Sequence, residues 1–261
     1  MVFSGKLHMH ISDITVIGGY NRSGEKEIVD SVKFNMGDVI SIVGPTGCGK
    51  TTFINDIELY ANCNTPSKRR VLINGIAQSE ELIIGNPSNN PVALISQHTN
   101  FLSDLLVKDF LHIHAGIRHV LNNDKIVQET VNFANQLTGE PLNLNGAMTE
   151  LSGGQTRSLL IADAVIIGNA PIILLDEIEN AGIHRNKVLE LLKKYKKIFI
   201  FVTHDPRIAL FSDYRIIMKN GGMNKVIFKN DKERIVAEKV RELDDYLVNI
   251  RNLLRNGDTI D

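Results

Sequence analysis

The sequence predicts an α/β fold built around a largely parallel β-sheet. Short runs rich in Ile, Val and Phe recur along the chain and are apolar on both faces, as strands covered by helices on either side must be. Segments with helical periodicity lie between these runs, and such alternation is typical of a parallel sheet. The predicted core strands are residues 39–43, 92–95, 172–175 and 198–202.

Helices are predicted between the strands, at residues 51–60, 104–137, 155–168 and 184–195. The segment 97–152 contains no convincing strand, so we expect a helical subdomain inserted between core strands. Near the start of the chain, residues 7–16 and 27–34 alternate between apolar and polar side chains, which predicts antiparallel edge strands. Residues 214–229 read as a hairpin with its turn at residues 220–222.

A long helix is predicted at the end of the chain, over residues 232–256. Asn230 and Glu233 fit the start of a helix as a capping box, and Gly257 fits its end. The apolar residues of this helix are spaced by four and three, which is the pattern of a helix with one partner face. They are Val236, Val240, Leu243, Leu247, Ile250 and Leu254. Such a face most often packs on its own domain, and a partner or dimer contact is the alternative.

Composition excludes several classes of protein. A chain of 261 residues can bury a sizeable core without disulfide or metal support. Its 29 Lys and Arg against 30 Asp and Glu give no global basic field, so no nucleic acid is expected as a partner. The two cysteines, Cys48 and Cys63, form no CxxC pair and indicate a reduced compartment. The most apolar stretch, residues 159–175, is interrupted by polar residues, so a membrane role would need another chain.

Residues 44–51 read GPTGCGKT and match the phosphate-binding P-loop pattern between a predicted strand and a predicted helix. The glycines let successive N–H groups curl around a phosphate, and the helix N-terminus adds about half a positive charge there. Lys50 is expected to reach the β- and γ-phosphates, and the Thr51 hydroxyl to bind Mg²⁺. The predicted nucleotide-binding residues of this loop are Gly44, Pro45, Thr46, Gly47, Cys48, Gly49, Lys50, Thr51 and Thr52.

Two acidic residues, Asp176 and Glu177, follow the apolar strand 172–175. Ionised carboxylates at the end of a buried strand are costly unless a cation or water lies nearby. With a P-loop upstream, Asp176 is interpreted as the Walker B carboxylate that holds Mg²⁺ through water. Glu177 is then the general base that orients and deprotonates the attacking water.

Residues 151–155 read LSGGQ, and here the chain resembles the ATP-binding cassette (ABC) ATPases over about residues 5–228. A Ser cap followed by two glycines at a helix N-terminus makes a second phosphate-sized nest. The resemblance implies that this nest closes over ATP held by the P-loop of a second cassette, so that catalysis needs a dimer, expected to be a homodimer. The residues of the nest are Ser152, Gly153, Gly154 and Gln155.

Three further residues fall where the family pattern places functional side chains. Gln97 resembles the Q-loop glutamine that touches Mg²⁺ or water, and His204 resembles the switch histidine that contacts the γ-phosphate. Tyr20 lies ahead of the P-loop and resembles the aromatic residue that stacks on adenine.

The chain departs from the family pattern in two places. After Glu177 the usual aspartate of the D-loop is missing in an ungapped register, and His184 takes its place if one residue is inserted. The LSGGQ sequence is the signature motif of the family. In the helix that follows this motif, Ser158 and Asp163 stand where transporter subunits usually carry arginines. Residues 68–70, with sequence KRR, are expected to be a solvated loop.

The resemblance implies a cytoplasmic ATPase that hydrolyses MgATP to ADP and phosphate. Its ATPase domain is expected over residues 1–229, with a helical subdomain at about 98–160 and a helical tail at 230–261. We favour a subunit that energises transport through separate membrane proteins, attached to the membrane only through them. The alternatives are a soluble ATPase that remodels or assembles a protein or metallocofactor complex, and an ATP-sensing module of low turnover.

Overall fold

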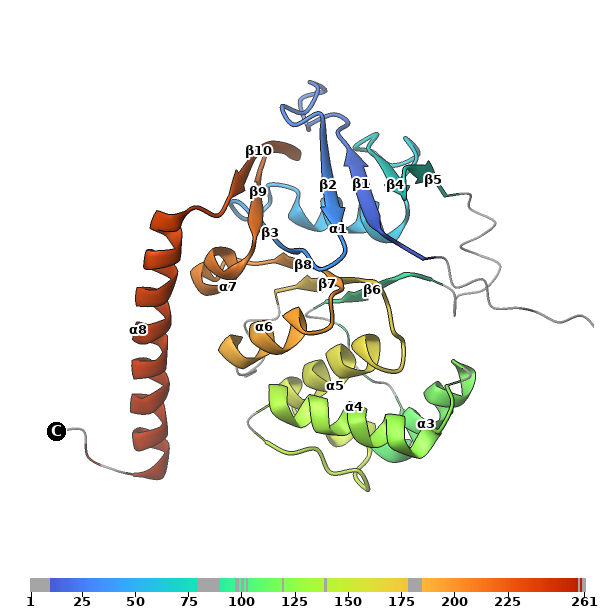
Figure 1. The fold of residues 1–261 in the computed structure, drawn as a ribbon, viewed down its shortest axis with the longest axis vertical. Coiled ribbons are helices and arrows are strands. Elements are labelled where there is room, and N and C mark those ends of the chain that lie inside the picture. Colours follow the sequence, from blue (N-terminus) through green and yellow to red (C-terminus); the bar gives the residue numbers. More distant parts are fainter. Residues whose placement is uncertain are drawn as a thin grey trace, which may run out of the picture.

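The computed structural model describes residues 10–78, 90–96, 99, 101, 103–118, 120–138, 140–177, 185–257 and 259 of the chain. Figure 1 shows two sheets in the upper part of the molecule, a group of helices below them, and one long helix standing to one side.

The larger sheet has six strands in the order β10-β9-β3-β8-β7-β6. The strands from β9 to β6 run parallel to their neighbours, and β10 pairs with β9 in the antiparallel direction. This arrangement confirms the predicted parallel core and its terminal hairpin. The strands are β3 (Val39–Val43), β6 (Val92–Ile95), β7 (Ile172–Asp176), β8 (Ile198–Val202), β9 (Tyr214–Lys219) and β10 (Gly222–Phe228).

The smaller sheet is antiparallel and has the strand order β2-β1-β4-β5. The first two strands were predicted, although each starts several residues later than expected. The last two were not predicted, because β4 and β5 are short and lie among turn residues. The strands are β1 (Asp13–Ile17), β2 (Ser31–Asn35), β4 (Arg70–Ile73) and β5 (Ile76–Ala77).

Helices lie between the strands of the six-stranded sheet and after it, and all of them except the short helix at Pro206–Phe211, which was not predicted, coincide with predicted helical segments. They are α1 (Lys50–Glu58), α3 (Val107–Ile117), α4 (Asn123–Leu137), α5 (Gly153–Val165), α6 (Arg185–Lys193), α7 (Pro206–Phe211) and α8 (Asp231–Asn256). The segment 104–137 forms two helices rather than a continuous one. Asn122 has a left-handed backbone with φ of 61°, which an α-helix cannot accommodate, so α4 begins only after it.

Two hydrophobic clusters lie on opposite faces of the six-stranded sheet. Alternate residues of β7 point to opposite sides: Ile172 and Leu174 join the cluster with α1 and the antiparallel sheet, whereas Ile173 and Leu175 join the cluster with α3, α4 and α5. Figure 1 shows α1 and α5 on either side of this sheet. The helix after the P-loop and the helix after LSGGQ are therefore separated by a layer of buried strands.

The helix α8 spans 26 residues and packs mainly on α7 (Figure 1). Asn230 caps it by accepting a hydrogen bond from the Glu233 N–H at 3.0 Å. The Glu233 side chain pairs with Arg215 rather than completing a capping box, and this hydrogen bond holds the pKa of Glu233 below its usual value. Gly257 ends the helix with φ of 78°. Within the described ranges, no helix combines the length and apolarity needed to cross a bilayer.

Candidate active site

The predicted site residues gather where parallel strands end. In the register of the sheet, Ile42 of β3 pairs with Val202 of β8, and Val202 also lies opposite Asp176 of β7. The three strand ends therefore form one row, and Glu177 and His204, which directly follow two of them, lie close together. Gln97 lies outside the described residues, but it follows β6, the next strand beyond β7. This row is the candidate active site.

The P-loop leaves β3 and turns into α1. Its glycines are required by the local backbone: Gly49 has φ of 100°, and a Cβ atom there would lie 2.8 Å from the Cα of Gly221. A Cβ atom on Gly44 would lie 2.5 Å from the carbonyl oxygen of Met218. No side chain caps α1, so its first N–H groups have no side-chain acceptor and suit an external anion.

Lys50 is the first residue of α1, and its side chain is buried under the loop. Its ammonium donates hydrogen bonds to the carbonyl oxygens of Gly44, at 3.0 Å, and Pro45, at 3.2 Å. The Lys50 ammonium therefore lies against the backbone of the P-loop, whose N–H groups are expected to bind phosphate. Pro45, Thr46 and Gly47 are exposed on the outer side of that curve.

Glu177 and His204 face each other across the ends of β7 and β8. The His204 Nε2 atom lies 3.7 Å from the Glu177 Oε1 atom, with 46% and 30% of the two side chains exposed. Glu177 has a left-handed backbone with φ of 50°, and its N–H donates to the Val202 carbonyl at 3.0 Å. Such a conformation costs about 1–2 kcal/mol for a residue other than glycine. The fold thus directs a carboxylate and an imidazole toward the same open space.

Polar contacts link the two neighbours of His204 in the sequence to α8. The buried Thr203 accepts a hydrogen bond at its hydroxyl oxygen from the Asp205 N–H, at 2.9 Å. The Asp205 carboxylate caps α7 and also pairs with Arg207, whose Nε atom lies 2.8 Å away. Arg207 pairs in addition with Asp244 of α8. The position of His204 is therefore linked to the docking of the C-terminal helix.

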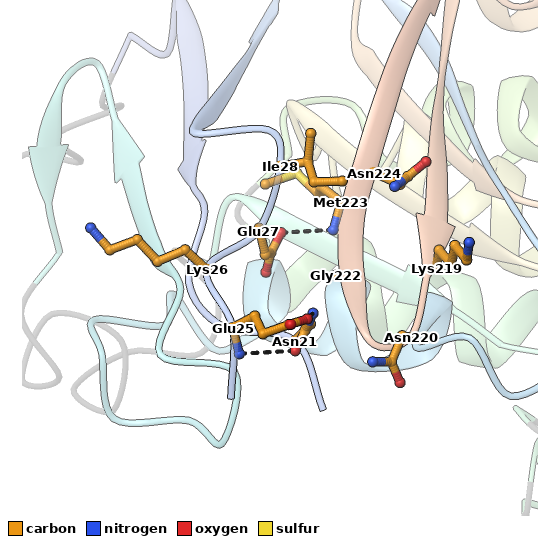
Figure 2. Close-up of a pocket in the computed structure, with 10 residues that line it drawn as sticks. All are labelled: Asn21, Glu25, Lys26, Glu27, Ile28, Lys219, Asn220, Gly222, Met223 and Asn224. Atoms are coloured by element: carbon orange, nitrogen blue, oxygen red, sulfur yellow. Dashed lines mark hydrogen bonds between the residues drawn. The ribbon is translucent and has the colours of Figure 1, made fainter. Parts of the chain in front are cut away.

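The loop that carries Tyr20 is joined to the P-loop through the turn between β9 and β10. The Arg22 N–H donates to the Asn220 carbonyl at 2.9 Å, and the Gly221 N–H donates to the Cys48 carbonyl at 2.8 Å. A pocket of about 220 Å³ lies between this loop and the hairpin. Figure 2 shows the residues of both segments that line it. Tyr20 is partly exposed beside these contacts, as a ring that meets a planar base would need to be.

Arg69 is a structural residue of the site that no sequence pattern indicates. It is fully buried and lies between two carboxylates, with its Nε atom 2.7 Å from Glu27 and its Nη1 atom 2.8 Å from Asp56 of α1. Its Nη2 atom donates to the Gly221 carbonyl at 2.7 Å. Arg69 therefore joins the antiparallel sheet, the P-loop helix and the hairpin turn that contacts the P-loop.

The prediction of a solvated loop at residues 68–70 is wrong for Arg69. Lys68 does lie in a turn and Arg70 is exposed, but the chain turns the guanidinium between them inward. Figure 2 shows Glu27, its partner, accepting a further hydrogen bond from the Met223 N–H, at 2.8 Å. The partners of Arg69 lie far from it in the sequence, so no local pattern signals its burial.

The signature residues form an exposed corner at the start of α5. The Ser152 hydroxyl oxygen accepts from the Gln155 N–H at 3.3 Å, and the Gln155 carbonyl oxygen Oε1 accepts from the Ser152 N–H at 3.0 Å. Ser152 and Gly153 are exposed, and Gly154 is half-buried. A Cβ atom on Gly153 would approach only the flexible end of Arg157, at 3.4 Å. The corner is thus rigidly capped but open to an approaching molecule.

Asp163, which follows the signature motif at a position where transporter subunits usually carry an arginine, contacts a histidine of α3. The Asp163 Oδ1 atom lies 2.7 Å from His114 Nδ1, and the Arg118 Nε–H donates to the other ring nitrogen of His114 at 3.2 Å. These contacts connect α5 to α3. Ser158 is buried in the same helix. His184, the candidate for the missing D-loop aspartate, lies outside the described residues.

Two of the three residues predicted to hold Mg²⁺, Thr51 and Asp176, are described and carry oxygen donors of the kind that ion takes, whereas Gln97 lies outside the described residues. Thr51 is exposed in the first turn of α1, and Asp176 ends β7 on the row described above. Within the described part of the chain, no cluster of three or more His, Cys, Asp or Glu side chains could hold a metal alone. Magnesium usually takes one or two protein oxygens and completes its shell with phosphates and water, which agrees with this sparse donor set.

The parallel sheet, the glycine loop that opens α1 and the acidic end of β7 define a P-loop nucleoside triphosphatase. A family model described as ABC transporter matches residues 29–180, which is more than half of the chain. The chain belongs to the ABC transporter family and is an ABC-type ATPase.

Similar proteins agree with this assignment. An uncharacterized ABC transporter ATP-binding protein of Methanocaldococcus jannaschii is 44% identical over 97% of this chain and 96% of its own length. The spermidine/putrescine import ATP-binding protein PotA of Bacteroides fragilis is 30% identical over 82% of this chain, which spans 46% of that protein. An ATP-binding cassette solved as a dimer with ADP and Pi matches 83% of this chain and 99% of its own, with a TM-score of 0.64 and 24% identity. These matches confirm the predicted cassette fold.

Proposed function

We propose that this chain hydrolyses MgATP at two composite sites, each formed between the P-loop side of one copy and the LSGGQ corner of another. One observation carries the proposal: the strand-end row and the exposed Ser152–Gly153 corner lie on separate parts of the same chain, although both suit a phosphate. A second copy in head-to-tail orientation supplies each row with a corner. The dimeric cassette with ADP and Pi supports this arrangement as a relative of the same fold.

Each phosphate-binding residue has a defined task in this proposal. The N–H groups at the start of α1 and the Lys50 ammonium hold the β- and γ-phosphates. Thr51, Asp176 and Gln97 would hold Mg²⁺. Magnesium, when bound, neutralises part of the charge on the phosphate oxygens. Tyr20 stacks on the adenine.

The reaction itself is carried by Glu177 and His204. Glu177 takes the proton from a water molecule whose oxygen forms the new bond to the γ-phosphorus, while the bond from that phosphorus to the β–γ bridging oxygen breaks. The products are ADP and phosphate. His204 donates to a γ-phosphate oxygen and, 3.7 Å from Glu177, limits where that carboxylate can lie. The second copy's Ser152, Gly153 and Gly154 stabilise the charge from the opposite side.

Substitution Glu177→Gln tests the proposal. The amide keeps the shape of the side chain but cannot accept the proton, so we expect turnover to fall at least about 10²-fold while an ATP-bound dimer accumulates. Steady-state phosphate release measures the first effect and light scattering with ATP the second. Glu190→Gln, on an exposed position of α6, is the matched control and should leave both unchanged. Turnover at the wild-type rate in Glu177→Gln would show that Glu177 is not the base.

The work driven by ATP is proposed to be transport through separate membrane subunits, with the chain on the cytoplasmic face of the membrane. The support is the match to import ATP-binding proteins over most of this chain. In this proposal residues 1–229 form the ATPase domain, about 98–160 its partner-binding helical subdomain, and 230–261 the helical tail.

A soluble remodelling ATPase is the second candidate. It is favoured by Asp163, which pairs with His114 in the place where transporter subunits usually carry an arginine. Affinity purification of the tagged chain from native membranes and from cytosol separates the two functions. Membrane proteins among the specific partners support transport, and a soluble partner alone supports remodelling. ATPase assays with and without that partner test the low-turnover sensor.

A further inference from the structure

The helix α8 exposes an apolar face that its own domain does not cover. We define the seam as Val236, Val240, Leu243, Leu247, Ile250 and Leu254. Four of them have large exposed fractions: 48% for Val236, 64% for Leu243, 49% for Leu247 and 60% for Leu254. The other two, Val240 and Ile250, are half-buried. Scattered exposed apolar residues are ordinary on a protein surface, but four that recur along one stripe of a helix indicate a contact.

The face by which α8 docks on its own chain is a different stripe. It is centred on Asp244, which is 7% exposed and pairs with Arg207. A second ion pair, between Glu233 and Arg215, fixes the N-terminal end of the helix. Attachment by these polar contacts holds α8 in place and leaves the seam beside the domain rather than against it.

The seam is continuous with the candidate active site. A groove of about 500 Å³ runs between the strand ends and α8. Glu177 and His204 line it on one side, and Val240, Leu243 and Leu247 line it on the other. Any molecule that covers the catalytic pair from the open side therefore reaches the seam as well.

We propose that the seam binds a second copy of this chain, whose own α8 packs along it about a two-fold axis. The inference rests on the proposed function, because the composite site already brings a second cassette to Glu177 and His204. Two features of α8 fit self-association. Its apolar residues follow the heptad spacing of paired helices, and the same stripe can meet itself across a two-fold axis.

The charge of α8 also permits pairing with a copy. The helix carries six acidic and six basic residues, so two copies do not repel each other. Charges of both signs flank the seam, with Lys239 and Arg251 on either side of Asp244 along the chain. The seam covers less than three heptads, and a helix pair of this length is weak by itself. We expect it to keep two cassettes close between rounds of ATP binding, at a raised effective concentration.

The experiment is the oligomeric state of the full chain without nucleotide, measured by sedimentation velocity over a range of protein concentrations. The test variant is Leu243→Glu with Leu247→Glu. The matched control is Asn249→Glu with Asn256→Glu, which adds the same charge to exposed positions away from the seam. We expect the wild type and the control to self-associate with equal Kd, and the seam variant at least about 10-fold more weakly. A monomeric wild type at 100 µM, or equal Kd values for both variants, overturns the inference.

A second pair of variants tests whether loss of the dimer results only from unfolding of α8. In a Cys63→Ser background, Leu247→Cys should form a disulfide-linked dimer under mild oxidation without nucleotide, whereas Asn249→Cys should not. Monomer only from Leu247→Cys, or equal cross-linking from both variants, overturns the inference.

The proposed seam contact and the proposed composite ATP site can be tested separately. The Glu177→Gln variant should still form an ATP-dependent dimer when it also carries the two seam substitutions, because the phosphate-binding surfaces remain. Loss of the nucleotide-free dimer with retention of the ATP-dependent one supports the seam. If the Glu177→Gln chain with both seam substitutions does not dimerise with ATP, but nucleotide-free association of the wild type depends on the seam, the composite site is wrong and the seam contact stands.

Discussion

The N-terminus of α1 and the N-terminus of α5 both carry glycines, but these glycines meet different surroundings. At α1 a Cβ atom on Gly49 would lie 2.8 Å from the Gly221 backbone, and φ at Gly49 is 100°. At α5 a Cβ atom on Gly153 would meet only the end of Arg157, at 3.4 Å. The chain's own packing thus explains Gly49 but does not explain Gly153, whose small size suits something outside the chain.

The caps of the two helices differ in the same way. The N-terminus of α1 lacks a side-chain cap, whereas Ser152 caps α5 through the Gln155 N–H. At α1, contacts within the chain shape the helix N-terminus for a ligand. At α5, the Ser152 hydroxyl already accepts a hydrogen bond from the helix N-terminus, which presents an exposed surface. This difference is what a site divided between two copies requires, and each prediction below tests one side of it.

The largest effect is expected at the support of the P-loop. Replacing Arg69 by Met leaves the buried carboxylates of Glu27 and Asp56 without their cation, which should lower the free energy of unfolding by about 3–5 kcal/mol. Urea denaturation measures the change. Arg70→Met is the matched control, because its exposed side chain should contribute less than about 0.5 kcal/mol. Equal stability of the two variants would contradict the role of Arg69.

The two glycines can be compared directly by the same substitution. Gly49→Ala should weaken ADP binding by at least about 10-fold, because the left-handed backbone and the contact with Gly221 both resist a Cβ atom. Gly153→Ala should leave ADP binding unchanged and lower ATP turnover by about 10²-fold. Calorimetry and phosphate release measure the two quantities. If Gly153→Ala turns over normally, the LSGGQ corner does not contact the reacting phosphate.

A smaller effect is expected from Lys197, on the same side of the sheet as α5. Burial lowers the pKa of Lys197 to about 8, although its ammonium donates to Asn169 Oδ1 at 2.7 Å. Because the unfolded chain binds this proton more tightly, the free energy of unfolding should rise between pH 8 and 10.5. Lys197→Met should therefore be more stable than wild type by about 2 kcal/mol at pH 7.

The stability difference between Lys197→Met and wild type should disappear as the pH approaches 10.5, the ordinary value of lysine. Denaturation curves of the two proteins at pH 7 and pH 10.5 check this. Lys194→Met, at an exposed position of the same segment, should differ little from wild type at either pH. A constant difference between Lys197→Met and wild type would show that charge burial is not its cause.

The smallest effects are expected at the helix caps. Ser152→Ala and Asn230→Ala each remove a side-chain acceptor at a helix start and should each cost about 1 kcal/mol of stability. Only Ser152→Ala should also lower ATP turnover, since Asn230 caps α8 away from the phosphates. Turnover measured at saturating protein concentration distinguishes them. An equal loss of turnover in both variants would mean that stability alone accounts for it.

The parts of this molecule that sequence could predict are those with local signals. Strands β3 and β8 are apolar on both faces and were placed with their observed bounds, and the P-loop, Asp176 and Glu177 follow from strand ends. The antiparallel strands β4 and β5 were missed because a strand of two to four residues has too few positions to show an alternating pattern. The break at Asn122 was missed because its neighbours are compatible with a helix.

What sequence could not predict depends on contacts between distant residues. Arg69 reads as one of three basic residues in a loop, and only its partners Glu27, Asp56 and Gly221 explain its burial. The link from His204 through Arg207 to Asp244 is hidden for the same reason. The heptad spacing of α8 did predict a partner face, but not that the face would stay uncovered by its own domain.

The hydrogen bond from the Gly221 N–H to the Cys48 carbonyl has a consequence for protein synthesis. The P-loop motif ends at residue 51, but the turn that fixes its shape comes 170 residues later, and Arg69 must also meet that turn. A nascent chain on the ribosome therefore carries the whole motif long before it can fold the loop. We expect such an intermediate to have no affinity for nucleotide until the β9–β10 hairpin has emerged from the exit tunnel.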